Sequence, residues 1–374
     1  MKFLHLADLH IGKHLENIPL FEDQRYVLNQ AVALAKDENV DCILLCGDIY
    51  DSAMPSSEAT KLYDDFLTSL YHLGKPILII SGNHDSSERL GLASAILSND
   101  GIYIQTDVAD INKPIVIGDT NFYLLPYFRP SEVAYAFNKE VRTYEEAFGI
   151  LLEAMNIDQN KQNVLLLHQA MLPKGTTILA SGSESALDLK PDYSIGGSEV
   201  IDVSLTSSFD YVALGHIHKA QNVAPNARYP GALLKYFKDE AKAKRSFTIV
   251  TIENKKLTIQ VHPVKPLHEL SVLEGTMDEV LAMDGHENDY VYVNLREEDY
   301  IQDASAKIKA KYPYFVKLQF KSIKQGNIET PEFEDVESVS KDDLFSAFFQ
   351  KYAGRELEEE EKTFIHSLLQ EEMQ

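Results

Sequence analysis

Five short apolar runs in this chain each end in side chains that bind metals or transfer protons. Runs of this length, bounded by turn residues, are typical of buried β-strands. They cover residues 2–6, 42–45, 76–80, 164–167 and 211–214. The polar residues at their ends are Asp8 and His10, Asp48, Asn83 with His84 and Asp85, His168, and His216 with His218. Ligands of open α/β sheets bind at the C-terminal ends of the strands, so we expect these residues to form one site.

Apolar residues recur at helical spacing between the first three runs and after the third. This order of strands and helices predicts a mostly parallel sheet with helices on both faces. The predicted helices are 22–36, 57–73, 88–97 and 131–155, and later strands are predicted at 228–234, 246–252 and 257–261. The stretch 171–200, rich in Gly, Ser and Pro, is predicted to be a surface loop near the site.

Turn residues and changes in composition divide the chain into three parts. Pro263 and Pro266 end the part that holds the five apolar runs, and Gly326 follows a small strand–helix–strand unit. The last part is an acidic linker followed by two short stretches with helical spacing, 338–352 and 356–369. The predicted domains are 1–265, 266–325 and 326–374.

The composition indicates a soluble cytoplasmic protein with a large core. The chain has 374 residues, of which 44% are hydrophobic, and no apolar run approaches the ~20 residues that a membrane span needs. Asp8 and His10 interrupt the N-terminal apolar stretch, which excludes a signal peptide. Cys42 and Cys46 lie on one predicted strand, roughly 13 Å apart, which is too far for a disulfide. We expect both to be buried thiols.

The charge is unevenly distributed along the chain. A net charge of −23 argues against a nucleic-acid partner, whose binding surfaces are usually basic. However, residues 305–325 contain six lysines and no acid. This stretch fits either of two alternatives, a surface that faces DNA or a solvated helix and strand edge. Residues 331–374 contain 13 acidic and four basic residues. The two C-terminal helices are too short to bury their apolar faces, so we expect them to dock on a partner protein rather than on their own domain.

The polar residues after the strands form a ligand set for two metal ions. Carboxylate and imidazole together suit Mn²⁺, Fe²⁺ or Zn²⁺. Seven ligands exceed the demand of one ion but suit two if one carboxylate bridges them, and Asp48 is the natural bridge. We assign Asp8, His10 and His218 to one ion, and Asn83, His168 and His216 to the other. Such a pair clamps a phosphate and supplies a hydroxide for attack on phosphorus, with no Ser or Cys nucleophile.

His84 and Asp85 are predicted to be catalytic rather than metal ligands. His84 follows Asn83 directly and is placed to protonate or stabilise the leaving oxygen. Asp85 is expected to orient its imidazole. The alternative is that His84 has only a structural role next to the ligands.

The motifs resemble the five sequence blocks of the calcineurin-like metallophosphoesterases, over about residues 1–260. In order, the blocks are Asp8-x-His10, Gly47-Asp48, Gly82-Asn83-His84-Asp85, His168 and Gly215-His216-x-His218. The stretches LADLHIGK at 6–13 and GDIYD at 47–51 are similar to the SbcD family of DNA nuclease subunits within this superfamily. The resemblance implies a four-layer α/β sandwich of mixed sheets, a small α/β capping domain and a C-terminal helical hairpin.

The same resemblance implies an activity and partners. The activity would be ATP-dependent 3′→5′ exonuclease cleavage of duplex DNA and endonuclease cleavage of single strands and hairpins, with two Mn²⁺ ions, in DNA repair, recombination and replication. The partner would be SbcC, a coiled-coil ATPase bound by the C-terminal helices, in a 2:2 complex that dimerises through the early helices of the phosphoesterase domain. Ala232 departs from the family, where Ser is expected. The basic residues that follow are candidate phosphate contacts: Lys235, Lys238, Lys242, Lys244 and Arg245.

Two other functions fit parts of the pattern. The first is a metallophosphoesterase that acts on small phosphodiesters or on phosphoproteins. Phosphoprotein phosphatases are expected to have Asp-Arg-Gly and Asn-His-Glu where this chain has Asp51-Ser52-Ala53 and Asn83-His84-Asp85. The second is a non-catalytic scaffold, which would be expected to have lost ligands, whereas none is missing here.

Overall fold

The computed structural model describes residues 1–109, 111–174, 176, 199–297, 301–320 and six positions beyond 344. The chain divides into two compact units, Met1–Lys321 and Ser322–Gln374, and the fold described below belongs to the first. Most of the predicted 171–200 loop lies outside the described residues, as do the acidic linker and almost all of the predicted C-terminal helices. No helix in the part that is described is long and apolar enough to cross a bilayer.

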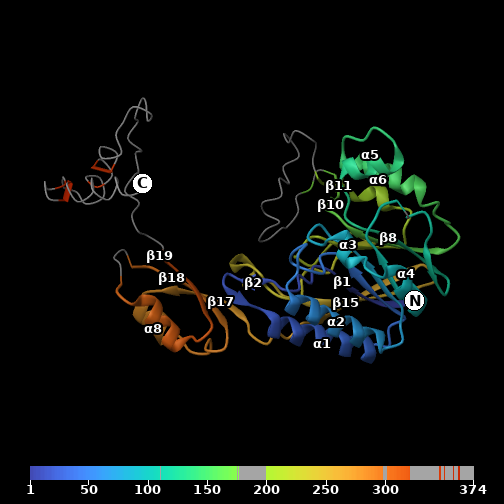
Figure 1. Cartoon of the computed structure of the whole chain (residues 1–374). Coiled ribbons are helices and arrows are strands. Elements are labelled where there is room, and N and C mark those ends of the chain that lie inside the picture. Colours follow the sequence, from blue (N-terminus) through green and yellow to red (C-terminus); the bar gives the residue numbers. More distant parts are fainter. Residues whose placement is uncertain are drawn as a thin grey trace. The chain divides into compact units, whose positions relative to one another are not determined.

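Two six-stranded mixed sheets form the centre of the part that the resemblance predicts to be the phosphoesterase (Figure 1). In each, four neighbouring strands are parallel, and the remaining strands pair antiparallel at the edges. The first sheet has the order β16 (Lys256–Pro263), β15 (Ser246–Glu253), β1 (Lys2–Leu6), β4 (Cys42–Cys46), β5 (Ile77–Ile80) and β6 (Ile102–Gln105). The second has the order β13 (Gln221–Ala224), β14 (Ala227–Tyr229), β12 (Tyr211–Gly215), β9 (Gln162–His168), β8 (Thr120–Leu125) and β7 (Ile115–Ile117).

Each sheet carries helices on one face only, so the expectation of helices on both faces was wrong. Alternation along β4 shows the reason, because side chains of neighbouring positions point to opposite faces. Ile43 and Leu45 pack in the core that contains α1 (Phe21–Asp37) and α2 (Ser57–Tyr71), whereas Cys42, Leu44 and Cys46 pack against the second sheet. Both cysteines are buried and free, as expected.

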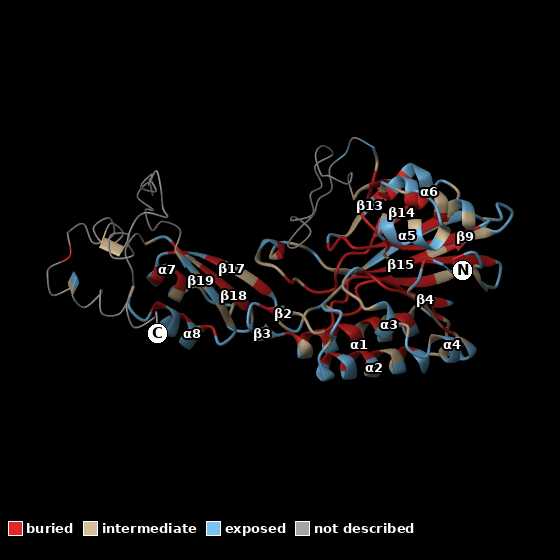
Figure 2. Ribbon diagram, turned by 45° about the horizontal axis from the view of Figure 1, so that its top comes forward, coloured by how far each residue is buried: buried red, intermediate tan, exposed pale blue. Residues whose placement is uncertain are grey.

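The second sheet buries its other face under helices α5 (Pro130–Phe137) and α6 (Tyr144–Ala154). The result is the four-layer α/β sandwich that the resemblance implied, with buried strands in the middle and exposed helix faces outside (Figure 2). Local signals set the helices: Ser56 caps α2 by accepting a hydrogen bond from Ala59 N, and Thr143 caps α6. The predicted helix at 88–97 is two short pieces, α3 (Ser87–Leu90) and α4 (Ser94–Leu97).

The capping part is a three-stranded parallel sheet with two helices. Its strands are β17 (Leu270–Gly275), β18 (Tyr290–Leu295) and β19 (Phe315–Phe320), and its helices are α7 (Met277–Ala282) and α8 (Ala304–Lys311). The sequence pattern indicated only the last strand–helix–strand, so β17 and α7 were missed. Short hairpin strands β2 (His14–Leu15) and β3 (Ile18–Pro19), and the parallel pair β10 (Met171–Leu172) and β11 (Ile201–Asp202), complete the fold.

Candidate metal centre

The predicted site residues meet where β1, β4 and β5 of one sheet and β9 and β12 of the other end. Backbone hydrogen bonds join the first two loops, from Asp8 N to Gly47 O (3.1 Å) and from His10 N to Asp48 O (3.0 Å). Two further bonds join the sheets: His216 N donates to Asp8 Oδ1 at 2.8 Å, and His168 Nδ1 contacts Cys46 O at 2.8 Å. The site is therefore built at the seam between the two sheets.

The side chains lie in two sets on either side of Asp48. In the first set, His10 Nε2 is 2.9 Å from His218 Nε2, and Asp8 offers an oxygen to the same cluster. In the second, Asn83 Oδ1 is 3.2 Å from His168 Nε2 and 3.0 Å from His216 Nδ1. Asp48 Oδ2 lies 3.6 Å from His10 Nε2 and 3.3 Å from His168 Nε2. All seven predicted ligands are thus brought together, with Asp48 in the place that a bridging carboxylate needs.

The electrostatics of this cluster favour a bound cation. Asp8 is buried, and its Oδ2 has no hydrogen-bond partner among the described residues, although such atoms are normally satisfied. Burial by itself raises the pKa of the Asp48 carboxyl, but the His168, His10 and His84 imidazoles outweigh burial and hold this pKa well below its usual range. Burial lowers the pKa of His168, yet Asp48 and Asp8 outweigh this and raise it to about 9. The buried carboxylates of Asp8 and Asp48 therefore favour a positively charged ligand, and a divalent metal ion would supply that charge.

Strained backbone accompanies the candidate ligands. Asp8, His10, Asp48 and His216 have φ values of +54°, +43°, +49° and +102°, a region that residues with a Cβ rarely adopt. Such conformations persist only where the surroundings enforce them, and they concentrate at functional sites. The fold thus holds the loops in conformations that aim these four side chains at one another.

Three glycines allow the loops to approach this closely. A Cβ on Gly82 would lie 2.2 Å from Asp48 Oδ1, and one on Gly47 would lie 2.1 Å from His168 Nδ1. A Cβ on Gly215 would lie 1.8 Å from Cys46 O. The sequence shows a glycine immediately before Asp48, Asn83 and His216. These glycines signalled sharp turns in the sequence, but their part in packing the site was missed.

His84 lies beside the first set of ligands. Its Nδ1 is 2.9 Å from Asp51 O, its backbone N donates to Asp48 Oδ1 at 2.9 Å, and its ring meets the His10 ring edge-on at 4.9 Å. Donation from Nδ1 to the Asp51 carbonyl leaves Nε2 free. His84 can also form a three-residue metal cluster with His10 and Asp48, a grouping that the sequence pattern did not indicate.

The expectation that Asp85 orients His84 was wrong. The Asp85 carboxylate accepts hydrogen bonds from the backbone N of Ile49 (3.1 Å), Tyr50 (2.9 Å) and Gly82 (2.8 Å). Burial and the charge of Asp48 raise the pKa of Asp85 to about 6 despite these bonds. Asp85 therefore connects the loop after β5 to the loop after β4. The Asp51 carbonyl, and not the Asp85 carboxylate, orients the His84 ring.

Comparisons with known proteins identify the family. The calcineurin-like phosphoesterase model matches residues 1–220. Two curated relatives, each named as the D component of the nuclease SbcCD, come from Staphylococcus saprophyticus and Staphylococcus epidermidis. They are 32% and 33% identical over 383 residues, which cover 99% of this chain and 98% of each relative. This chain belongs to the SbcD family of calcineurin-like phosphoesterases. It is therefore a hydrolase of phosphate esters.

A second family model and two solved structures also match this SbcD-family chain. The model of the Type 5 capsule protein repressor C-terminal domain matches residues 266–352. Among solved structures, TT1561 of Thermus thermophilus is similar with a TM-score of 0.41 and 15% identity over 70% of this chain and 98% of that one. A dimetal phosphatase from Danio rerio has a TM-score of 0.40 and 14% identity over 71% of this chain and 96% of that one.

A buried acid next to His218, Glu240, was missed as part of the site in this SbcD-family chain, and the candidate phosphate contact Arg245 pairs with it. The buried Glu240 lies 3.6 Å from His218 Nδ1 and 2.7 Å from Arg245 Nη2, and Arg245 also donates to His218 O. His218 and Arg245 outweigh burial and hold the pKa of Glu240 below its usual range. Metal-binding histidines commonly contact a carboxylate through the second ring nitrogen, so Glu240 suits the support of a ligand. In the sequence, Glu240 stands within a run of lysines. Those lysines were interpreted as phosphate contacts, and the acid among them was overlooked.

Three of the five candidate phosphate contacts are engaged within the protein. Lys235 forms an ion pair with Glu269 at 2.5 Å, Lys238 donates to the side chains of Asn294 (2.7 Å) and Gln319, and Arg245 is held as described above. Lys242 and Lys244 pair with no described acidic side chain, so their charges remain available to a ligand. The buried Ala232 occupies the position where the family resemblance led us to expect Ser.

Proposed function

We propose that this chain is the nuclease subunit of an SbcCD-type complex and that it hydrolyses DNA phosphodiester bonds with two divalent ions, Mn²⁺ being the working pair. The observation that carries this proposal is the position of Asp48 between two sets of ligands that come from two different sheets. One set is Asp8, His10 and His218, and the other is Asn83, His168 and His216. The names of the curated relatives support DNA as the substrate.

The proposed chemistry divides between the ions and the chain. Two bound divalent ions activate a water and neutralise charge on the phosphate. Asp48 holds the two sites at a fixed separation, because its carboxylate is locked by His84 N and lies between His10 and His168. Asp85 acts as a positioning residue, since its three backbone contacts keep the Asp48 and Asn83 loops together.

His84 is proposed to be the group that assists the leaving oxygen. With Nδ1 donating to the Asp51 carbonyl, a protonated His84 presents its second N–H from Nε2 toward the cluster. That N–H donates a proton or a hydrogen bond to the oxygen that departs from phosphorus. The edge-on contact with the His10 ring supports this role, because it keeps the His84 ring next to the first ligand set.

A basic and aromatic groove next to the centre suits a DNA strand. This groove, about 1080 Å³ in volume, lies between the β2–β3 hairpin, the 236–242 segment and the cap. Phe237 stacks on His218 with ring centroids 6.2 Å apart, and Lys13 lies 5.1 Å above the Phe237 ring. Lys238 contacts the Asn294 and Gln319 amides and the Tyr292 ring but forms no ion pair with a described acid, so its charge is available to a phosphate. Lys13 and Lys317, in contrast, pair with Asp51 and Glu16. Bases stack on aromatic rings while phosphates bind lysines.

The finer activities are part of the proposal. They are ATP-dependent 3′→5′ exonuclease cleavage of duplex ends and endonuclease cleavage of single strands and hairpins, in repair, recombination and replication. We propose domains at 1–265 (nuclease), 266–325 (cap) and 326–374 (binding of the SbcC ATPase). The exposed Leu92 and Ile96, next to α3 and on α4, support dimerisation through the early helices in a 2:2 complex. The overall charge of −23 implies weak DNA affinity without SbcC.

The test is digestion of end-labelled duplex and hairpin DNA with Mn²⁺, by the wild type and by His84→Gln. We expect the variant to lose cleavage and to keep its bound manganese, measured by elemental analysis. A small chromogenic phosphodiester serves as a parallel substrate. Rapid hydrolysis of the small diester with intact DNA would favour the alternative, a phosphodiesterase of small molecules. Unchanged DNA cleavage by His84→Gln would remove this residue from the mechanism.

A further inference from the structure

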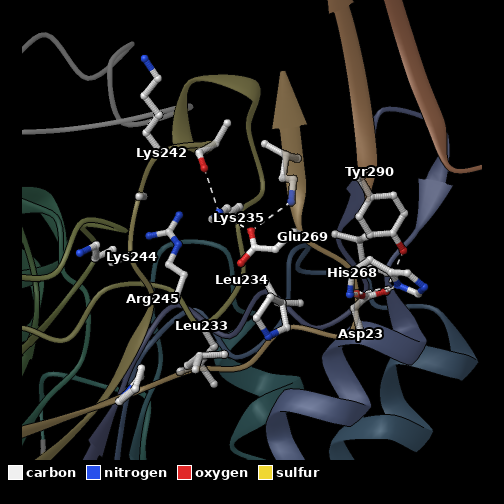
Figure 3. A pocket seen from close by; sticks show the side chains of 17 residues that line it. Asp23, Leu233, Leu234, Lys235, Lys242, Lys244, Arg245, His268, Glu269 and Tyr290 are labelled. Carbon is white, nitrogen blue, oxygen red and sulfur yellow. Dashed lines mark hydrogen bonds and ion pairs between the residues drawn. The ribbon is translucent and has the colours of Figure 1, made fainter. Parts of the chain in front are cut away.

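A cavity of about 320 Å³ lies between the phosphoesterase part and the cap, and none of the residues that line it is a candidate metal ligand (Figure 3). Its apolar lining includes Leu233 and Leu234 from the segment after β14, and Pro263 and Val264 from the link to the cap. Its cationic lining includes Lys242, Lys244 and Arg245 on one side, and the polar side chains of His268 and Tyr290 lie on the other. The cavity thus combines an apolar interior with a cationic rim.

The acids that line this cavity are already paired. Asp23 accepts from the Tyr290 hydroxyl at 2.7 Å and contacts His268 Nδ1 at 3.1 Å. Glu269 forms the ion pair with Lys235 at 2.5 Å. No described acidic side chain pairs with Lys242 or Lys244. Lys242 and Lys244 therefore carry positive charge that no described acid pairs with, and this charge attracts an anion.

Arg245 contributes a buried donor to the same cavity. Its side chain is only 6% exposed, its Nη1 donates to His218 O, and its Nη2 pairs with Glu240. Its Nε is buried and has no hydrogen-bond partner among the described residues. A buried donor left without a partner is rare in folded proteins, because the lost hydrogen bond destabilises the folded state. A ligand oxygen in the cavity would supply that partner.

We propose that this cavity binds a phosphomonoester of nucleotide size, with the phosphate near Lys244, Lys242 and Arg245 Nε and the base against Leu233 and Leu234. The volume is at the small end of ligand pockets, which suits one nucleotide rather than a strand. The choice of a mononucleotide as the ligand rests on the proposed function, because cleavage of a terminal phosphodiester of DNA releases a mononucleotide. Since Arg245 also holds the His218 carbonyl, the ligand would bind next to the support of one candidate metal ligand.

The test is calorimetric titration of the full-length protein with dAMP, deoxyadenosine and inorganic phosphate, with Mn²⁺ and again after chelation. We expect a saturable dAMP site that persists after chelation, because none of the residues that line the cavity is a candidate metal ligand. Deoxyadenosine and phosphate should each bind at least about tenfold more weakly, since each satisfies only half of the site. Equal affinity for phosphate alone, or no saturable dAMP binding after chelation, would overturn the proposal.

Two variants locate the binding. Lys244→Glu reverses a rim charge, and Leu234→Trp fills the interior; each should weaken dAMP binding at least tenfold. Lys256→Glu, at an exposed position at the start of β16, is the matched control and should bind as the wild type does. If Leu234→Trp fails to fold by circular dichroism, Lys244→Glu decides alone, and unchanged dAMP binding by it contradicts the proposal. DNA cleavage is measured in a separate assay. A result that contradicts the nuclease function can therefore be distinguished from one that contradicts this binding site.

Discussion

The Asp48 carboxylate lies 3.3 Å from His168 Nε2, although Asp48 follows a strand of the first sheet and His168 ends a strand of the second. The two residues meet because Cys42, Leu44 and Cys46 of β4 pack against the apolar face of the second sheet. The candidate metal centre thus depends on the packing of the two sheets and not on either sheet alone.

Replacing Asp48 by Asn should abolish binding of both metal ions. The amide keeps the shape of the side chain but removes the charge that lies between His10 and His168. We expect DNA cleavage to fall by more than about 100-fold. This loss exceeds the one expected when a residue that only hydrogen-bonds to a metal ligand is replaced. Elemental analysis and a nuclease assay measure the two effects. Asp64→Asn, at an exposed position on α2, is the control, and two retained ions in Asp48→Asn would argue against a bridge.

Glu240→Gln should weaken binding at the first metal site without removing it. The variant loses the charge next to His218 Nδ1, and such supports change metal affinity by about 10–100-fold. The Mn²⁺ concentration that gives half-maximal cleavage should rise, and high Mn²⁺ should restore the rate. Glu253→Gln, exposed at the end of β15, should leave the Mn²⁺ dependence unchanged. A loss that excess Mn²⁺ cannot restore would point to a folding role instead.

The metal-free protein should lose stability at alkaline pH through His168. The pKa of His168 in the folded protein is raised to about 9, above its ordinary value of 6.5. Its contribution is therefore fully present below pH 6.5 and is lost as pH rises through 9. Denaturant unfolding of chelated protein at pH 6.5 and 9.5 measures this change. His168→Gln should show a smaller decrease over the same range, and an equal decrease in both proteins would refute the assignment.

Gly82→Ala should displace Asp48 and destabilise the loops around the site. The new Cβ would lie 2.2 Å from Asp48 Oδ1 and 2.3 Å from Asp48 N, so the loops must move. We expect a loss of about 1–3 kcal/mol in the free energy of unfolding, together with loss of bound metal. Gly149→Ala on α6 is the control, because nothing lies within 4 Å of its added Cβ. In a helix interior that change should stabilise by about 0.5–1 kcal/mol.

Lys238→Ala should weaken DNA binding without affecting the metals. Lys238 lines the groove of the proposed DNA strand, where it contacts the Asn294 and Gln319 amides and the Tyr292 ring and forms no ion pair with a described acid. Loss of one phosphate contact should weaken binding for every DNA sequence and reduce the salt dependence of log K by about 1. Binding titrations over a range of salt concentrations measure this slope. Lys256→Ala is the control, and an unchanged slope in Lys238→Ala would place the strand elsewhere.

Several features of the site could be predicted from the sequence because they are local. Each apolar run and the polar residue after it are neighbours in the chain, and parallel strands bring their C-terminal ends to one edge. This reasoning found all seven candidate ligands and His84. It failed for Asp85, whose partners Ile49 and Tyr50 belong to another loop, and for Glu240, whose relation to His218 follows from the course of the chain after β14.

The sequence by itself determined the five strands that lead to the site, most helices, the buried cysteines and the residues that gather around Asp48. Only the tertiary structure decided that β4 faces a second sheet and that Asp85 and Glu240 support the site from outside. The reason is that an apolar strand is equally well buried under helices or under another sheet, so its pattern specifies burial and not the element that provides it.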